Sequence, residues 1–218
     1  MKALLKVGLL SVLFLFVTII SAQNKIVTVG VRAGVNFSGV SSGAPGDKTK
    51  VGFNFGMTAD FRLSDEIYLL TGLEYTVKGA KGKSFIEAGV DTWGQYYDDH
   101  YYVTSEKPAY LQLPLHVGYL WAINRDFRLM FHAGPYMAYG MGGKNDRKWT
   151  YKDKTEKESI NYFGVGVSKF DWGLGAGVNT EYDRYVLGLG YDLGLKKFAP
   201  DYGNAKTRNM YITLGYLF

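Results

Sequence analysis

The sequence predicts an all-β fold, an eight-stranded antiparallel transmembrane β-barrel whose strands form an up-and-down meander. Three observations predict it: apolar residues recur at every second position in eight segments, glycine and aromatic residues are abundant, and short connections alternate with long ones. The chain has 218 residues with 28 Gly, 18 Tyr, 13 Phe, 4 Trp and no Cys. A chain without Cys has no disulfide, thiolate metal site or Cys nucleophile. A hydrophobic content of 47% argues against disorder.

The first 22 residues have the pattern of a signal peptide. Lys2 and Lys6 precede an apolar run over residues 7–20, and the small residues Ser21 and Ala22 follow. The run is shorter than the ~20 residues of a spanning helix. We therefore expect cleavage after Ala22, with residues 1–22 as signal peptide and 23–218 as the barrel; an uncleaved anchor is the alternative. Cleavage removes two lysines and lowers the net charge from +5 to +3.

Period-two alternation runs through the rest of the chain and is typical of β-strands. In the segment 51–63, the odd positions are apolar, and the even positions hold glycine and polar residues. The segment 170–182 alternates in the same way. The predicted strands are residues 26–37, 51–63, 66–79, 109–121, 126–141, 169–182, 185–196 and 207–218.

The apolar face of these strands is predicted to point outward, toward lipid. The large side chains are too numerous for the interior of a small barrel, whereas glycines and a few charged residues fit a narrow lumen. Backbone groups in hydrocarbon must all be paired, and strands achieve this by closing into a barrel. Membrane-spanning strands need about 9–11 residues, and each predicted segment is long enough.

The connections predict the orientation of the barrel. Residues 64–65, 123–125 and 183–184 form short turns, and the other connections are longer. Short periplasmic turns and long external loops are typical of outer-membrane barrels. Both termini are therefore predicted to be periplasmic.

Eight strands leave an interior that side chains fill, so we predict a filled polar lumen. Buried charges should be paired and hydrogen-bonded. An ion path through the same residues is the alternative. The predicted polar network of the lumen consists of Arg32, Asp60, Arg62, Glu74, His116, Arg128, His132, Asp171, Glu181 and Asp192.

Two histidines and two prolines allow a test of register. If the turn after the fourth strand centres on Asn124, His116 lies directly opposite His132 and Pro114 faces Gly134. Two adjacent histidines could bind a metal or titrate as a pair, or they could be neutral imidazoles within the plug. Since a closed barrel has no free edge for proline, a bulge or bend is expected near Pro114 and Pro135.

The long loops offer little evidence of catalysis. Asp98, Asp99 and His100 could form a catalytic or metal cluster, or they could belong to an aromatic loop that packs or touches partners. The loop 142–168 carries charges of both signs and could contact lipopolysaccharide phosphates. No clustered basic stripe indicates nucleic acid. We predict no enzymatic activity, no metal and no cofactor.

Several motifs resemble those of Bacteroidetes-type outer-membrane β-barrel proteins, the porin family or PorT-like small barrels. They are YLQLPLHVGY at residues 110–119, FDWGLGAGV at 170–178, YITLGYLF at 211–218 and Ser21-Ala22-Gln23. Tyr216 and Phe218 resemble a recognition signal of the barrel assembly machinery, although Thr213 stands where that signal has glycine.

The resemblance implies a bacterial outer-membrane location. The expected function is a non-enzymatic barrel with a structural or surface-binding role through long extracellular loops. The alternatives are a narrow porin for small solutes or ions, and an accessory barrel of a protein secretion machine. The expected partners are outer-membrane lipid and lipopolysaccharide, the barrel assembly machinery, periplasmic chaperones and other envelope proteins.

Overall fold

The computed structural model describes residues 26–41, 47–90, 92–152, 154–163, 167–196 and 206–218. No helix in these ranges is long and apolar enough to cross a membrane. The predicted signal peptide lies outside the described residues. The described chain forms the strands β1 (Val27–Ser41), β2 (Asp47–Arg62), β3 (Ile67–Val77), β4 (Ala80–Ile86), β5 (Gly89–Val90), β6 (Tyr96–Tyr97), β7 (His100–Ala122), β8 (Phe127–Thr150), β9 (Thr155–Asn161), β10 (Phe170–Tyr182), β11 (Tyr185–Gly194) and β12 (Lys206–Leu217).

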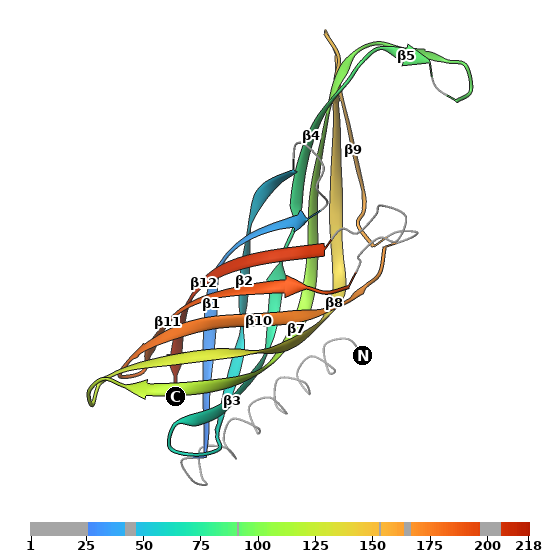
Figure 1. The fold of residues 1–218 in the computed structure, drawn as a ribbon. Helices are drawn as coiled ribbons and strands as arrows, with labels where there is room; N and C mark the ends of the chain where they lie inside the picture. The colour runs from blue at the N-terminus through green and yellow to red at the C-terminus, as the bar shows by residue number, and fades with distance from the viewer. Residues whose placement is uncertain (1–25, 42–46, 91, 153, 164–166, 197–205) are drawn as a thin grey trace, which may run out of the picture.

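Eight of these strands close into a ring (Figure 1). The order around the ring is β1, β2, β3, β7, β8, β10, β11 and β12, and β12 pairs back with β1. Every pairing is antiparallel. Since each ring strand pairs with its neighbours in chain order, the predicted eight-stranded meander barrel is confirmed.

The outer surface of the ring is apolar, as the alternation predicts. Along β10 and β11, exposed and buried residues alternate. The exposed side chains include Trp172, Leu174 and Leu189, while Asp171 and Asp192 are buried. An apolar outer surface belongs in lipid, where the closed ladder satisfies the backbone polar groups.

The predicted assembly signal lies at the end of the last strand. The Tyr216 and Phe218 rings are 5.6 Å apart between centroids, and the Phe218 side chain is exposed. The Phe218 amide donates to the Val29 carbonyl, which fixes this end of β12 to β1. The role of the two residues in assembly stays a prediction.

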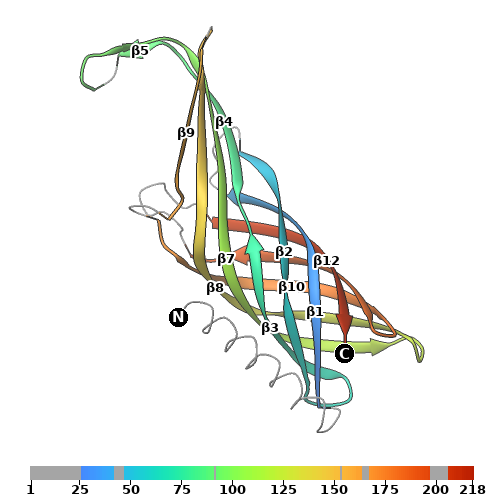
Figure 2. The ribbon, with the colours of Figure 1, turned by 180° about the vertical axis from the view of Figure 1, so that it is seen from behind.

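The two largest predicted loops differ from expectation, since they contain strands. β7 and β8 continue beyond the barrel, β4 pairs with β7, and β9 pairs with β8. We call this four-stranded extension the arm: β4, residues 100–107 of β7, residues 144–150 of β8, and β9. It rises from the barrel end opposite the C-terminus (Figures 1 and 2). The side chains of these strands show no alternation of apolar and polar residues, so the hydropathy pattern of the sequence did not predict the arm.

The register of β7 and β8 corrects two details. The pairs Gly118↔His132 and Ala122↔Arg128 centre the turn on Arg125, one residue later than predicted. Pro114 therefore faces Tyr136 rather than Gly134, and His116 is not directly opposite His132. The physical reason is a longer turn, in which the Asn124 side chain accepts from the amides of Asp126 and Phe127.

The ladders of β7 are interrupted beside both prolines, as expected. The pairing with β8 has a gap between Pro114↔Tyr136 and Val117↔Ala133, and the pairing with β3 has a gap between Thr71↔Leu115 and Glu74↔Gln112. A change of register lies elsewhere in this hairpin. The register of β7 and β8 shifts between Ala109 and Tyr110, where Tyr110 pairs with Gly140 and Ala109 pairs with Gly142. This shift comes where the arm leaves the barrel, and the gaps at Pro114 and Pro135 leave the register unchanged. An extra residue increases the local twist of a strand, which suits a point where two long strands leave a closed ring.

Candidate functional site

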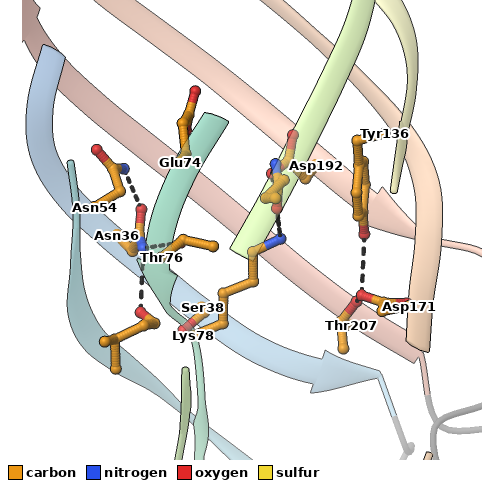
Figure 3. Close-up of polar contacts among 12 residues, drawn as sticks. Asn36, Ser38, Asn54, Glu74, Thr76, Lys78, Tyr136, Asp171, Asp192 and Thr207 are labelled. Atoms are coloured by element: carbon orange, nitrogen blue, oxygen red, sulfur yellow. Dashed lines mark hydrogen bonds and ion pairs between the residues drawn. The ribbon is translucent and has the colours of Figure 1, made fainter. Parts of the chain in front are cut away.

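Neutral amides fill the arm-side half of the lumen. The Asn36 amide on β1 donates to Thr76 Oγ1 at 2.8 Å and to the Val77 carbonyl at 3.1 Å. The Asn54 amide on β2 donates to Asn36 Oδ1 at 2.6 Å. Figure 3 shows these side chains converging from three neighbouring strands. The sequence analysis did not single them out, although their alternation places them on the same face as Arg32 and Glu74.

A buried lysine lies beside this cluster. Lys78 Nζ donates to Gln112 Oε1 at 2.5 Å and lies 3.4 Å from Asp192 Oδ2. The Gln112 amide donates to the same carboxylate at 3.1 Å. Lys78 Nζ also lies 4.6 Å from the ring centroid of Tyr136. The sequence analysis missed Lys78, although it continues the alternation of Glu74 and Thr76.

Two further predicted carboxylates have partners in the lumen. Glu74 on β3 forms a salt bridge with Arg32 on β1. Gly56 on β2 is opposite both residues, and its lack of a side chain lets them meet across the strand. Asp171 Oδ2 accepts from the hydroxyls of Tyr136 at 3.4 Å and Thr207 at 3.3 Å.

The other predicted network residues lie toward the turns. Arg128 forms a salt bridge with Glu181 at 2.9 Å. Asp60 lines a small cavity together with Arg32 and Glu181. Arg62 differs from the expectation, because it is exposed and pairs with Asp65 at 2.5 Å in the following turn. It therefore lies at the rim rather than among the lumenal contacts.

The two predicted histidines meet despite the corrected register. His116 Nδ1 and His132 Nδ1 are 2.8 Å apart, so one nitrogen donates and the other accepts. The rings stack with centroids 5.1 Å apart. A Cβ at Gly175 or Gly177 would lie within 3 Å of these imidazoles, so the neighbouring strand has glycine where the rings lie. The contact excludes two imidazolium ions, because both Nδ1 atoms would then be donors.

Apolar and aromatic side chains are buried toward both ends of the lumen. Leu70, Leu120 and Met130 form a buried cluster near the turns. Tyr110, Tyr136 and Ala138 form another at the arm end, with Phe163 packed on it. The cavity lined by Arg32, Asp60 and the histidine pair measures about 40 Å³, which is room for roughly three water molecules. The lumen is thus layered rather than polar throughout.

Of the candidate cluster Asp98, Asp99 and His100, only the histidine is packed into the arm, and both aspartates are exposed. His100 is buried, and its Nδ1 lies 2.8 Å from the Asp98 carbonyl oxygen. Its ring contacts Tyr151, with centroids 4.9 Å apart. Among the described residues, no group of three or more His, Cys, Asp or Glu side chains is placed to hold a metal ion. The geometry of His100 fits an aromatic packing role.

The two faces of the arm carry different ion pairs. Lys107 pairs with Asp146 at 2.7 Å on one face, where Ser159 also donates to Asp146. These two hydrogen bonds, that of Lys107 first, hold the pKa of Asp146 below its ordinary value. On the other face, Arg147 lies 4.0 Å from Glu158.

A closed antiparallel ring with an apolar outer surface defines an integral membrane barrel. The chain belongs to the outer membrane protein beta-barrel domain family, whose model matches residues 21–199. The location that follows is the bacterial outer membrane. No curated protein matches the chain.

Solved barrels show a weak overall likeness. Ail, the attachment invasion locus protein of Yersinia pestis, crystallised with the heparin analogue sucrose octasulfate, is 16% identical with a TM-score of 0.40 over 88% of this chain and 99% of Ail. Neisserial surface protein A is 14% identical with a TM-score of 0.38 over 87% of this chain and 97% of that chain. The N-terminal β-barrel domain of Pseudomonas aeruginosa OprF is 11% identical with a TM-score of 0.32 over 87% and 97%.

Proposed function

We propose that this protein is a non-enzymatic surface protein of the outer membrane, with a closed lumen and an extracellular arm that binds a partner outside the cell. The observation that carries the proposal is the division of the chain into a plugged barrel and a long paired arm. Lys78 pairs with Asp192 in the lumen, buried apolar clusters lie toward both ends, and the cavity beside the histidine pair has room for roughly three waters. Such an interior serves stability rather than passage, so a narrow porin is disfavoured.

The finer assignments rest on the sequence motifs. The segments at residues 110–119, 170–178 and 211–218 support a Bacteroidetes-type small barrel. Tyr216 and Phe218 support recognition by the barrel assembly machinery, with periplasmic chaperones and outer-membrane lipid, including lipopolysaccharide, as further partners. The accessory-barrel role in secretion has no specific support in the lumen or the arm.

Planar-bilayer recording tests the closed lumen. The purified full chain is expected to give no reproducible single-channel steps in neutral lipid, because the apolar clusters toward both ends and the buried ion pairs block the interior. A porin reconstituted in parallel shows that insertion can be detected, and protection of the barrel strands from protease in vesicles of the same lipid shows that the chain inserts. Reproducible steps from the inserted wild-type chain would contradict the closed-lumen assignment.

Protease accessibility on intact cells tests the orientation. The arm lies at the barrel end opposite the C-terminus, so external protease is expected to cut within residues 80–107 or 144–161. An epitope tag inserted in the short turn at residues 64–65 is expected to stay protected until the outer membrane is permeabilised. A tag that intact cells expose to antibody would reverse the proposed orientation.

A further inference from the structure

One face of the arm is crowded with lysines. The register places Lys81, Ser105, Asp146 and Ser159 in one row across the four strands, and Lys48 of β2 lies opposite Lys81. Positions two residues away along each strand share this face. We call it the lysine face, and its exposed lysines are Lys48, Lys81, Lys83, Lys107, Lys144, Lys148 and Lys157.

These lysines lie directly opposite one another. The cross-strand pairs are Lys48↔Lys81, Lys107↔Lys144 and Lys148↔Lys157. Like charges in opposite positions destabilise a sheet. Along the described strands of the arm, Asp146 is the acid on this face, and it already pairs with Lys107. A ligand of negative charge would relieve the repulsion in these three pairs, so the face favours binding of an anion.

Protection of a sheet edge does not account for the arrangement. Edge strands often carry lysine to prevent pairing with other chains, and Lys157 on β9 fits that role. Lys144 and Lys148 lie on β8, which is paired on both sides along the arm. Their charge has no edge to protect.

Lys50 of β2 connects the lysine face to the barrel. Lys50 follows Asn54 and Gly52 on the inner side of β2, and its Nζ donates to Ser105 Oγ on the lysine face at 2.8 Å. The opposite face carries Glu106, Arg147, Glu156 and Glu158. The net positive charge of the arm is therefore gathered on the lysine face. Since the arm rises beyond the barrel end (Figure 1), a ligand in the aqueous phase can reach it.

The aromatic residues on the lysine face narrow the ligand class. Phe85 and Tyr101 are half exposed, and their rings are tilted by 56° with centroids 5.1 Å apart. Lys83 Nζ lies 4.4 Å from the Tyr101 ring centroid. Single-stranded nucleic acids bind by stacking successive bases on aromatic rings, and this tilted, partly covered pair offers no parallel platform.

We propose that the lysine face binds a soluble sulfated or phosphorylated polysaccharide that approaches from outside the cell. This inference rests on the proposed surface-binding function and names its ligand class. Charge complementarity supplies the affinity, so binding should weaken steeply with salt, as counterions return to the polyanion.

Heparin binding in an uncharged detergent provides the test, with the full chain titrated at several NaCl concentrations. The variant K148Q/K157Q is expected to raise the Kd for heparin by roughly ten- to fiftyfold near 0.1 M salt. It should also reduce by about two the magnitude of the slope of log binding constant against log salt concentration. The matched control, R125Q/R184Q, removes the same charge from turns at the other barrel end and is expected to leave Kd unchanged.

Stability gives a second readout that a purely structural role would not produce. The variant K148E places opposite charges across from Lys157, so hydrogen exchange of the arm amides should slow while heparin binding is lost. Faster exchange together with lost binding would indicate that the variant had only unfolded the arm, and would overturn the assignment of Lys148 as a ligand contact.

The remaining outcomes separate the candidate ligands. Equal weakening by both double variants, or tighter binding of a single-stranded oligonucleotide than of heparin, would overturn the proposal. Heparin binding in phosphatidylcholine nanodiscs that disappears in lipopolysaccharide nanodiscs would assign the face to the lipid instead. If the chain binds no heparin and gives no conductance steps, the polysaccharide proposal is wrong and the proposed function stands. If the chain gives conductance steps, the proposed function itself is wrong.

Discussion

Lys78→Met is expected to destabilise the barrel by about 3–5 kcal/mol, because it leaves the buried carboxylate of Asp192 without a counter-ion. The Lys78 and Asp192 side chains are 4% and 3% exposed, so water cannot replace the lost contact. The Gln112 amide would be the remaining donor to that carboxylate among the described contacts. Urea titration of the full chain in lipid vesicles, followed by Trp fluorescence, measures the change in the free energy of unfolding.

Two controls define the cause of that loss. The double variant K78M/D192L removes both charges, and it should recover most of the lost stability, since an apolar pair can replace a buried ion pair. Lys107→Met breaks the exposed pair with Asp146 and should cost less than about 1 kcal/mol. A double variant as unstable as Lys78→Met would mean that side-chain packing, rather than charge, is lost.

The same lysine shows what the sequence could and could not predict. Period-two alternation identifies which face a residue occupies, and it correctly placed Glu74 and Asp192 inside. Lys78 obeys the same alternation and falls within the predicted strand 66–79, yet the predicted network omitted it; in the structure it directly follows the last residue of β3. Which lumenal residues pair depends on how far each strand is staggered, and one residue of error at Arg125 already misplaced His116 relative to His132.

The arm was hidden for a different reason. Its strands alternate between two polar faces, so hydropathy carries no period there. The run Glu156-Lys157-Glu158 appears as mixed charge along the chain. Pairing β9 with β8 sends Lys157 to one face and both glutamates to the other. The mixed charges along the chain are therefore separated onto opposite faces of the sheet once the strands pair.

Gly56→Val tests whether glycine in the lumen is what allows distant charges to meet. A Cβ at Gly56 would lie 2.3 Å from the Leu73 carbonyl oxygen and 2.9 Å from Glu74 Cγ. The backbone cannot yield easily, so the valine should overpack the wall and separate Arg32 from Glu74. We expect a loss of about 3–5 kcal/mol in the free energy of unfolding, combining overpacking with an unpaired buried charge.

Gly39→Val is the matched control, because a Cβ at Gly39 has no atom within 4 Å and valine suits a strand. It should change stability by less than about 0.5 kcal/mol. The two contributions at Gly56 are separated in the background R32M/E74L, where no ion pair remains to be broken. There, Gly56→Val should cost only the overpacking, about 1–3 kcal/mol. An undiminished cost in that background would show that Arg32 and Glu74 do not depend on the missing side chain between them.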